Sequence, residues 1–306
     1  MPAPIVVVGS LNMDFVAQVD CLPLPGETVL GSGFRTIPGG KGANQACAAG
    51  RLGGRVRMVG RVGDDVFGRQ LRESLRTSGV DARAVSSTGA TPSGVALIVV
   101  DARGENQIVV AAGANGCLTP LDVETALGDA DGGYLLLQLE TPLDTVVAAA
   151  AIGRQRGLTV ILDPAPARAL PAAMLECVDI LTPNEMEALV LLGRRETAMS
   201  LDQAPDVARA LRDLGVATAI LKLGENGAFL SSASAQGHFA APRVEAVDAT
   251  AAGDTFNGAL AVALAEGRSV GDAITFANAA AALSVTRFGA QASIPSRADV
   301  DARPKG

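Results

Sequence analysis

Short apolar segments alternate along this chain with segments whose apolar residues recur at helical spacing. Such alternation predicts an α/β fold, in which a mostly parallel sheet is covered by helices on both faces and forms three layers. The apolar runs at 134–137 and 159–162 are unbroken, as expected of strands that are buried on both sides. The pattern predicts strands at 4–8, 55–60, 133–137, 158–162, 178–181 and 216–222, and helices at 42–52, 66–78, 142–155, 184–192 and 203–213.

Two regions, residues 15–37 and 94–110, break this alternation and are typical of strands joined by turns. Their turn signals are Pro25-Gly26 and the polar residues 103–106. Residues 15–19 alternate between apolar and polar, which indicates a sheet with one face in solvent. The length of 306 residues allows one or two domains, and the chain contains no repeat, low-complexity tract or long linker.

Composition argues against several classes of protein. A net charge of −7 and a pI of about 4.9 argue against a nucleic-acid partner. No apolar run approaches the ~20 residues of a membrane span, and the first strand begins too early for a cleaved signal peptide. We therefore expect a cytoplasmic protein with no membrane partner. The cysteines are scattered and His238 is the one histidine, so a zinc site is not indicated.

Residues 248–258, DATAAGDTFNG, carry the strongest chemical signal. Small residues lead into an Asp and then a helical pattern at 259–266. A helix N-terminus offers about four unpaired amides and a partial positive charge, so Ala251, Ala252 and Gly253 would let a phosphate approach closely. Asp254 beside that anion suits a general base. On these residues alone, an Asp that caps an ordinary helix is an equal alternative.

A second glycine turn opens an Ala-rich helix at 38–50, PGGKGANQACAAG. It is not a phosphate-binding loop of the GxxxxGK[ST] type, because Lys41 is followed by Gly and no Gly lies five residues before it. A tight turn with helix packing is the alternative. Asn12 and Asp14 follow the apolar segment 5–8, and polar residues just past a strand are where open α/β sheets hold ligands.

Together these segments resemble the ribokinase family of sugar kinases, also called the phosphofructokinase-B-like family. The motifs that carry the resemblance lie in the family's order at 9–14, 25–28, 39–44, 138–140, 163–167, 182–185 and 248–258. The resemblance covers roughly residues 5–294. It implies one catalytic domain over 1–306, in which 15–37 and 94–110 form a small β lid that also pairs two subunits into a homodimer.

The resemblance implies ATP-dependent transfer of a phosphoryl group to the primary 5-hydroxyl of D-ribose. Kinases of fructose, 2-keto-3-deoxygluconate or a nucleoside are the alternatives within the family. Asp254 would be the general base, and the amides of Ala251, Ala252 and Gly253 would form the anion hole. The family's pattern places the sugar beside Asn12, Asp14, Gly40, Lys41, Gly42, Asn44, Ala96, Glu140 and Asp254, with Gly39 nearby. Glu140 as a solvated residue and Ala96 as plain packing stay open.

The same resemblance implies an ATP site formed by Asn184, Glu187, Lys222, Gly224, Asn226, Gly227 and Asn278. Asn184 and Glu187 match an N-x-x-E pattern near Mg²⁺ and the phosphates, with a helix cap and a surface Glu as the alternative. Lys222 departs from the Thr that ribokinases often have there, which alters a phosphate contact. Asn278 matches a position lining the adenine pocket, with a structural role as the alternative.

The family also places K⁺ beside the anion hole, between the segment before the catalytic helix and the loop after the last long helix. The matching positions are Asp248, Thr250, Ser284, Arg287, Gly289 and Ser293. A hard cation needs oxygen ligands, so Arg287 would offer only its carbonyl. Two packed surface loops are the alternative. The expected cofactors are thus ATP, Mg²⁺ and K⁺.

Two other classes of protein fit the sheet pattern. A catalytically silent binding protein would share the fold, but the intact Gly253-Asp254 pair argues against it. A dinucleotide oxidoreductase would carry G-x-G-x-x-G after its first strand, and this chain does not.

Overall fold

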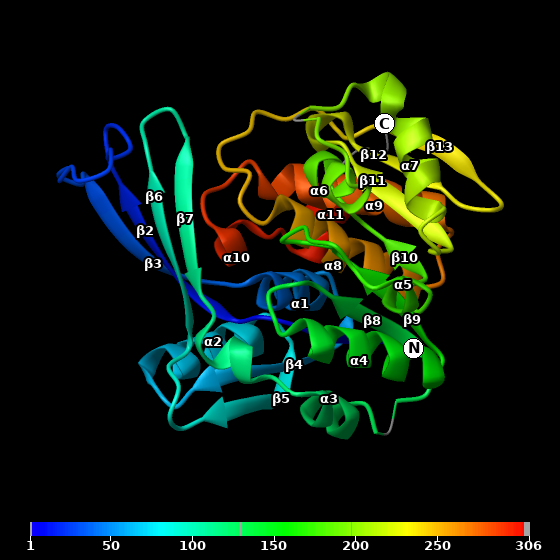
Figure 1. Cartoon of the computed structure of the whole chain (residues 1–306), viewed down its shortest axis with the longest axis horizontal. Coiled ribbons are helices and arrows are strands. Elements are labelled where there is room, and N and C mark those ends of the chain that lie inside the picture. The colour runs from blue at the N-terminus through cyan, green and yellow to red at the C-terminus, as the bar shows by residue number, and fades with distance from the viewer. Residues whose placement is uncertain (1, 129, 197, 303–306) are drawn as a thin grey trace.

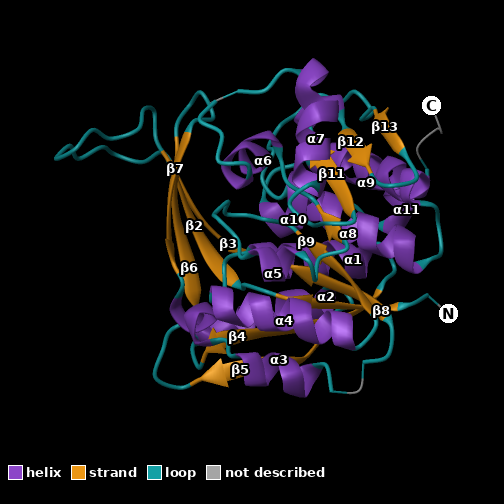
Figure 2. Ribbon diagram, turned by 45° about the vertical axis from the view of Figure 1, so that its right-hand side comes forward, coloured by secondary structure: helices purple, strands orange, loops and turns teal. Residues whose placement is uncertain are grey.

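Two sheets organise the protein in the computed structural model, which describes residues 2–128, 130–196 and 198–302. Within these residues the large sheet has nine strands in the order β13-β12-β11-β10-β9-β8-β1-β4-β5, and the small sheet has four in the order β3-β2-β6-β7 (Figure 1). The small sheet stands to one side of the large sheet and its helices (Figure 2).

All six predicted strands are present in the large sheet. Its strands are β1 (Pro4–Val8), β4 (Arg55–Gly63), β5 (Asp81–Thr88), β8 (Gly133–Leu137), β9 (Leu158–Leu162), β10 (Ile180–Leu181), β11 (Thr218–Lys222), β12 (Ala228–Ser231) and β13 (Gln236–Phe239). The seven strands from β11 to β5 in this sheet order pair in parallel. Strands β12 and β13 add an antiparallel edge that the sequence did not predict.

Helices cover both faces of this sheet, as predicted. The α-helices are α1 (Lys41–Arg51), α2 (Val66–Thr77), α3 (Pro120–Ala126), α4 (Leu143–Gln155), α5 (Ala172–Leu175), α6 (Glu185–Leu191), α7 (Ala204–Arg212), α8 (Ala252–Ala265), α9 (Val270–Ser284), α10 (Ala290–Ser293) and α11 (Arg297–Asp301), with 3₁₀ turns η1 (Gly113–Cys117), η2 (Leu201–Gln203) and η3 (Gly224–Asn226). Strand β1 shows the layering, because Ile5 and Val7 join one hydrophobic cluster and Val6 and Val8 join the other. None of the helices in the described part of the chain has the length and apolar character of a membrane span.

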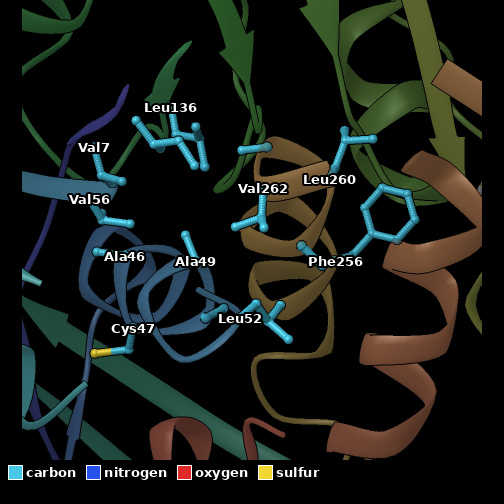
Figure 3. Close-up of a cluster of buried hydrophobic side chains, with 14 of the residues drawn as sticks. Val7, Ala46, Cys47, Ala49, Leu52, Val56, Leu136, Phe256, Leu260 and Val262 are labelled. Carbon is cyan, nitrogen blue, oxygen red and sulfur yellow. The ribbon is translucent and has the colours of Figure 1, made fainter. Parts of the chain in front are cut away.

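Helices α1 and α8 pack closely in the first of these clusters (Figure 3). Ala49 of α1 faces Val262 of α8, and Ala46 of α1 lies on the side of Val7 and Val56 (Figure 3). A β-carbon on Gly258 of α8 would lie 2.7 Å from the Gln45 carbonyl oxygen, so only glycine permits this approach. The contact brings the first turns of both helices together.

The small sheet confirms the strands expected within 15–37 and 94–110. Its strands are β2 (Asn12–Gln18), β3 (Gly33–Gly39), β6 (Gly94–Val100) and β7 (Asn106–Ala111). The β2–β6 pair is parallel and the other two pairs are antiparallel, so the sheet is mixed. Every residue of β7 is exposed, whereas the ends of β2 and β3 that meet α1 are buried.

Candidate active site

Asp254 lies in the first turn of α8 and is only 5% exposed. Its Oδ2 accepts a hydrogen bond from Asn44 Nδ2 at 3.0 Å, and its Oδ1 accepts one from Gln45 Nε2 at 3.1 Å. Burial raises the pKa of Asp254 to about 6. The Lys41 ammonium and the side-chain amides of Asn44 and Gln45 oppose this rise, and the Asp163 carboxylate adds to it. A fixed carboxylate with a pKa near neutrality has the properties of a general base.

The turn before Asp254 leaves backbone amides open. Ala251 adopts the left-handed conformation, with φ 60°, and the Ala252 amide donates to the Ala249 carbonyl at 3.2 Å. Among the described residues, the amides of Ala251, Gly253 and Asp254 have no hydrogen-bond acceptor. The helix start therefore offers three donors to an anion. The predicted anion hole consisted of the amides of Ala251, Ala252 and Gly253. In the structure the Ala252 amide is already hydrogen-bonded, and the Asp254 amide is open in its place.

Lys222, at the end of β11, lies beside these amides. A β-carbon on Gly253 would lie 3.3 Å from Lys222 Nζ. The same ammonium forms a buried ion pair with Asp163 Oδ1 at 2.8 Å. The residue that departs from the family's usual Thr thus places a positive charge at the candidate phosphate site, held there by Asp163.

The small sheet and α1 supply polar groups on the other side of Asp254. Asp14 is 9% exposed, and burial, together with Glu140 and Asp254, raises its pKa to about 7. Strand pairing sets Ala96 beside Asp14. Asn44 Oδ1 is buried without a hydrogen-bond partner, although Asn44 Nδ2 contacts Asp254. Unpaired acceptors next to a base are suited to a hydroxylated ligand.

The glycines of the 39–44 segment allow α1 to begin against the backbone that joins β1 and β2. A β-carbon on Gly40, which has φ 89°, would lie 2.6 Å from the Asn12 amide nitrogen, and one on Gly42 would lie 2.7 Å from the carbonyl carbon of Gly9. The Gly42 amide donates to Ser10 Oγ at 3.4 Å. The structure therefore gives Gly40 and Gly42 a packing role, and the Gly42 amide is already engaged.

Glu140 and Lys41 belong to this same cluster. Glu140 Oε2 accepts hydrogen bonds from Ser10 Oγ at 2.6 Å and from the Lys41 amide at 3.1 Å. Burial would lower the pKa of the Lys41 ammonium, but the surrounding carboxylates, foremost Asp254 and Asp163, raise it overall. Lys41 thus stays charged. Asn12 Oδ1 accepts from Asn115 Nδ2 at 2.7 Å, which fixes the Asn12 side chain.

The expected nucleotide residues gather where β10 and β11 end. Asn184 and Glu187 form a reciprocal capping box at the start of α6, with bonds of 2.7 and 2.8 Å. The cap expected as an alternative is thus present. Glu187 is nevertheless near the charged residues of the site: burial raises its pKa, and the Lys222 ammonium opposes that rise. Asn184 pairs with Lys222 in an isolated bridge.

The nucleotide loop continues from Lys222 through η3. Gly224 and Asn226 lie in η3, and Gly227 has φ 92° beside the Phe239 carbonyl, where no β-carbon fits. Asn278, 4% exposed in α9, donates to the Phe239 carbonyl at 2.8 Å. The Asn278 amide therefore holds the segment after β13 in place.

The two segments expected around K⁺ lie side by side. Asp248 Oδ1 accepts from the Thr250 amide and Oδ2 from the Gly289 amide, both at 2.9 Å, and these bonds hold its pKa low although burial would raise it. The hydroxyls of Ser284 and Ser293 donate to carbonyls of their own helices, which leaves lone pairs on their oxygens. The guanidinium of Arg287 forms an ion pair with Asp299, at 3.7 Å.

Sequence reasoning missed five residues of this cluster. They are Ser10, Gln45, Asn115, Gln138 and Asp163. Ser10, Gln138 and Asp163 lie inside segments that carried the family resemblance, and Gln45 directly follows the segment 39–44. Those positions were the only available signal, because the partners of these residues are distant in sequence.

The chain belongs to the pfkB family of carbohydrate kinases, which residues 3–297 match. It is an ATP-dependent sugar phosphotransferase, as the motifs predicted. It is 41% identical over 298 residues to the ribokinase of Haemophilus influenzae, with 97% of each chain covered. It is 38% identical over 294 residues to the deoxyribokinase of Salmonella typhi, with 95% of each covered. The solved Arabidopsis thaliana ribokinase complexed with ribose and ATP matches with a TM-score of 0.88 and 35% identity, over 98% of each chain.

Proposed function

We propose that this kinase transfers the γ-phosphoryl group of ATP to the primary 5-hydroxyl of D-ribose, giving ribose 5-phosphate. The observation that carries the proposal is the position of Asp254. It lies between the open amides of α8 with Lys222 on one side and the unpaired Asn44 oxygen with Asp14 on the other. The similarity to ribokinases favours ribose as the acceptor.

In this proposal, Asp254 takes the proton of the 5-hydroxyl as that oxygen attacks the γ-phosphorus and ADP leaves. The amides of Ala251, Gly253 and Asp254, with the Lys222 ammonium, stabilise the charge on the transferred group. Asn44 Oδ1 accepts a sugar hydroxyl. Asp14 is poised, with its pKa near 7, to bind another hydroxyl in either protonation state.

The residues present also fit two cations. Glu187 lies near Lys222 and Asp163, and one of its oxygens is not used in the cap, so Asn184 and Glu187 would hold Mg²⁺ through its water shell. When bound with ATP, Mg²⁺ neutralises phosphate charge. The two joined loops offer oxygens for K⁺ from Asp248, Thr250, Ser284, Arg287, Gly289 and Ser293, where Arg287 would use its carbonyl alone.

The lid supports the further proposal of a homodimer. Its outer strands expose apolar side chains, among them Phe34 (64% exposed), Ile108 (53%) and Val109 (64%). Exposed apolar strands of this kind are typical of a protein interface. A second copy of this chain, with its own lid, is the partner we propose. A cytoplasmic location remains the expectation from sequence.

The proposed function is tested with Asp254→Asn. The variant keeps the size of the side chain but loses the base, so we expect kcat to fall by at least ~10²-fold while ribose binding, measured by calorimetry, changes less. In the wild type kcat/KM should rise with pH through about 6, because only the deprotonated carboxylate is active. A folded variant with near-normal kcat would exclude Asp254 as the base.

The similarity to a deoxyribokinase makes 2-deoxyribose the second candidate acceptor. We expect ribose to be preferred, because removing a paired hydroxyl costs on the order of 1–3 kcal/mol. The measurement is kcat/KM for both sugars with ATP consumption as the readout. Equal values, or a strong preference for a hexose or nucleoside, would rule out ribose as the preferred acceptor.

A further inference from the structure

Gln45 on α1 has a side chain that is entirely committed within the protein. It is 1% exposed. Its Nε2 donates to Asp163 Oδ2 at 2.9 Å and to Asp254 Oδ1 at 3.1 Å, and its Oε1 accepts from Gln138 Nε2 at 2.6 Å. Both N–H groups are used and the oxygen is occupied, so Gln45 has no free donor for a substrate.

The two carboxylates that Gln45 bridges are both buried, Asp163 at 2% and Asp254 at 5% exposure. Like charges held this close in a low-dielectric site need donors between them. The amide supplies one donor to each. The second oxygen of Asp163 takes the Lys222 ammonium at 2.8 Å, so a continuous chain of contacts runs from Lys222 at the phosphate site, through Asp163 and Gln45, to Asp254.

Gln45 also completes the orientation of the carboxylate. A carboxylate held by one oxygen can rotate about the bond to its β-carbon, whereas one held by both oxygens has a fixed plane. Asn44 holds Oδ2 and Gln45 holds Oδ1 of Asp254. The plane of the Asp254 carboxylate is therefore fixed relative to the first turn of α8.

We propose that Gln45 is a positioning residue for phosphoryl transfer: its amide holds Asp254 in line with the phosphate site by anchoring it to the Asp163–Lys222 ion pair. The inference rests on the proposed function, in which Asp254 is the base. Gln45 does not touch substrate, and it acts through Asp254.

Charged and polar groups face Asp254 from several elements. Lys41, Asn44 and Gln45 come from α1, Asp163 follows β9, and Asp14 comes from β2. Lys222 acts through Asp163. Gln45 is the neutral member between two of these carboxylates, so replacing it with Glu adds a third acidic group of the same size at that point.

The test uses Gln45→Met and Gln45→Glu in the full chain. We expect Gln45→Met to lower kcat by about 10- to 100-fold, with KM for ribose and ATP within about threefold of wild type, because the base is misplaced while the ligand contacts remain. We expect Gln45→Glu to lower kcat and to shift the acid limb of its pH profile upward by about one unit or more, since a proton is then shared among three carboxylates.

Thr145→Val on α4 is the matched control. Thr145 is 1% exposed and donates to the Leu118 carbonyl at 2.8 Å, on the other face of the large sheet. Thr145→Val removes one buried hydrogen bond, whereas Gln45→Met removes three, and the kcat of Thr145→Val should not change.

A folded Gln45→Met with wild-type kcat, or with its whole effect in KM, would overturn the inference. If Gln45→Met does not fold, Gln45→Glu decides, and an unmoved acid limb with normal kcat would overturn it. Measuring Asp254→Asn in the same assay distinguishes a failure of the proposed base from a failure of the positioning role. An active Asp254→Asn refutes the proposed base, whereas an inactive one beside normal Gln45 variants refutes only the positioning role.

Discussion

Asp14→Asn should stabilise the ligand-free protein increasingly as the pH rises. The Asp14 carboxylate is buried, lies against Gly39, and faces Glu140 and Asp254. Its pKa is raised from 3.8 to about 7. The native state therefore holds this proton more tightly than the unfolded chain does. The stability contributed by protonated Asp14 is complete below about pH 4 and is lost as the pH rises through about 7.

The structure sets the magnitude. The pKa difference, about 7 minus 3.8, is about three units, which corresponds to about 4 kcal/mol once the group is ionised in both states. Between pH 5 and pH 8 the linkage amounts to about 2–3 kcal/mol. For 306 residues at about 2.1 cal/mol/K each, the unfolding entropy is about 0.6 kcal/mol/K, so the corresponding change in Tm is about 4 °C. Asn has the size of Asp and no charge, so the variant does not suffer this loss.

The assay is scanning calorimetry of wild type, Asp14→Asn and the control Asp20→Asn from pH 5 to pH 8, without ligands. Asp20 is an exposed carboxylate just past β2. We expect the Tm of Asp14→Asn minus that of wild type to grow by about 4 °C over this range, and that of Asp20→Asn to track the wild type. A constant or shrinking difference for Asp14→Asn would show that this carboxylate is not held protonated by its surroundings.

Three further predictions concern packing, the cation and the lid. Gly42→Ala should lower stability by about 1–3 kcal/mol, because its β-carbon would meet backbone atoms at 2.7 Å, and Gly89→Ala, which meets nothing within 4 Å, should not; equal Tm values would refute this. Initial rates should be higher in K⁺ than in Na⁺ at constant ionic strength, with choline as the balance, and Asp248→Ala should greatly reduce the difference; a flat response would exclude the cation. Val109→Lys should convert a dimer to a monomer in light scattering, and an unchanged mass would exclude the lid as the interface.

Most of the large sheet could be predicted because its strands and helices have distinct apolar periods. The elements that were missed lack that signal. Strand β13 is short and largely polar, and β5 carries polar residues over most of its length. The start of α8 at Ala252 was predicted, but from the small residues that precede Asp254 rather than from an apolar period, which appears only at 259–266.

Residues of the candidate site could be predicted only where they belong to a short local motif. Asp254 and Asn44 could be named from their motifs, but the Gln45–Asp163 bond joins residues 118 positions apart. No pattern in one sequence gives that distance. Backbone detail was also hidden: the left-handed Ala251 turns the Ala249 carbonyl onto the Ala252 amide, which changes the set of amides left for an anion.

The charges around Asp254 divide the proposed site into two halves, which would bind their ligands by different means. Its ionisable groups are Asp14, Glu140, Asp163, Glu187 and Asp254 against Lys41 and Lys222. A neutral sugar needs only hydrogen bonds, and the acidic half supplies them. A polyphosphate would be repelled there, so it depends on donors without a carboxylate partner, which are the amides that open α8, and on added cations. Because Gly258 lets α8 pack closely on α1, the two helices place Asp254 of α8 next to Asn44 of α1, at the boundary between the two proposed halves.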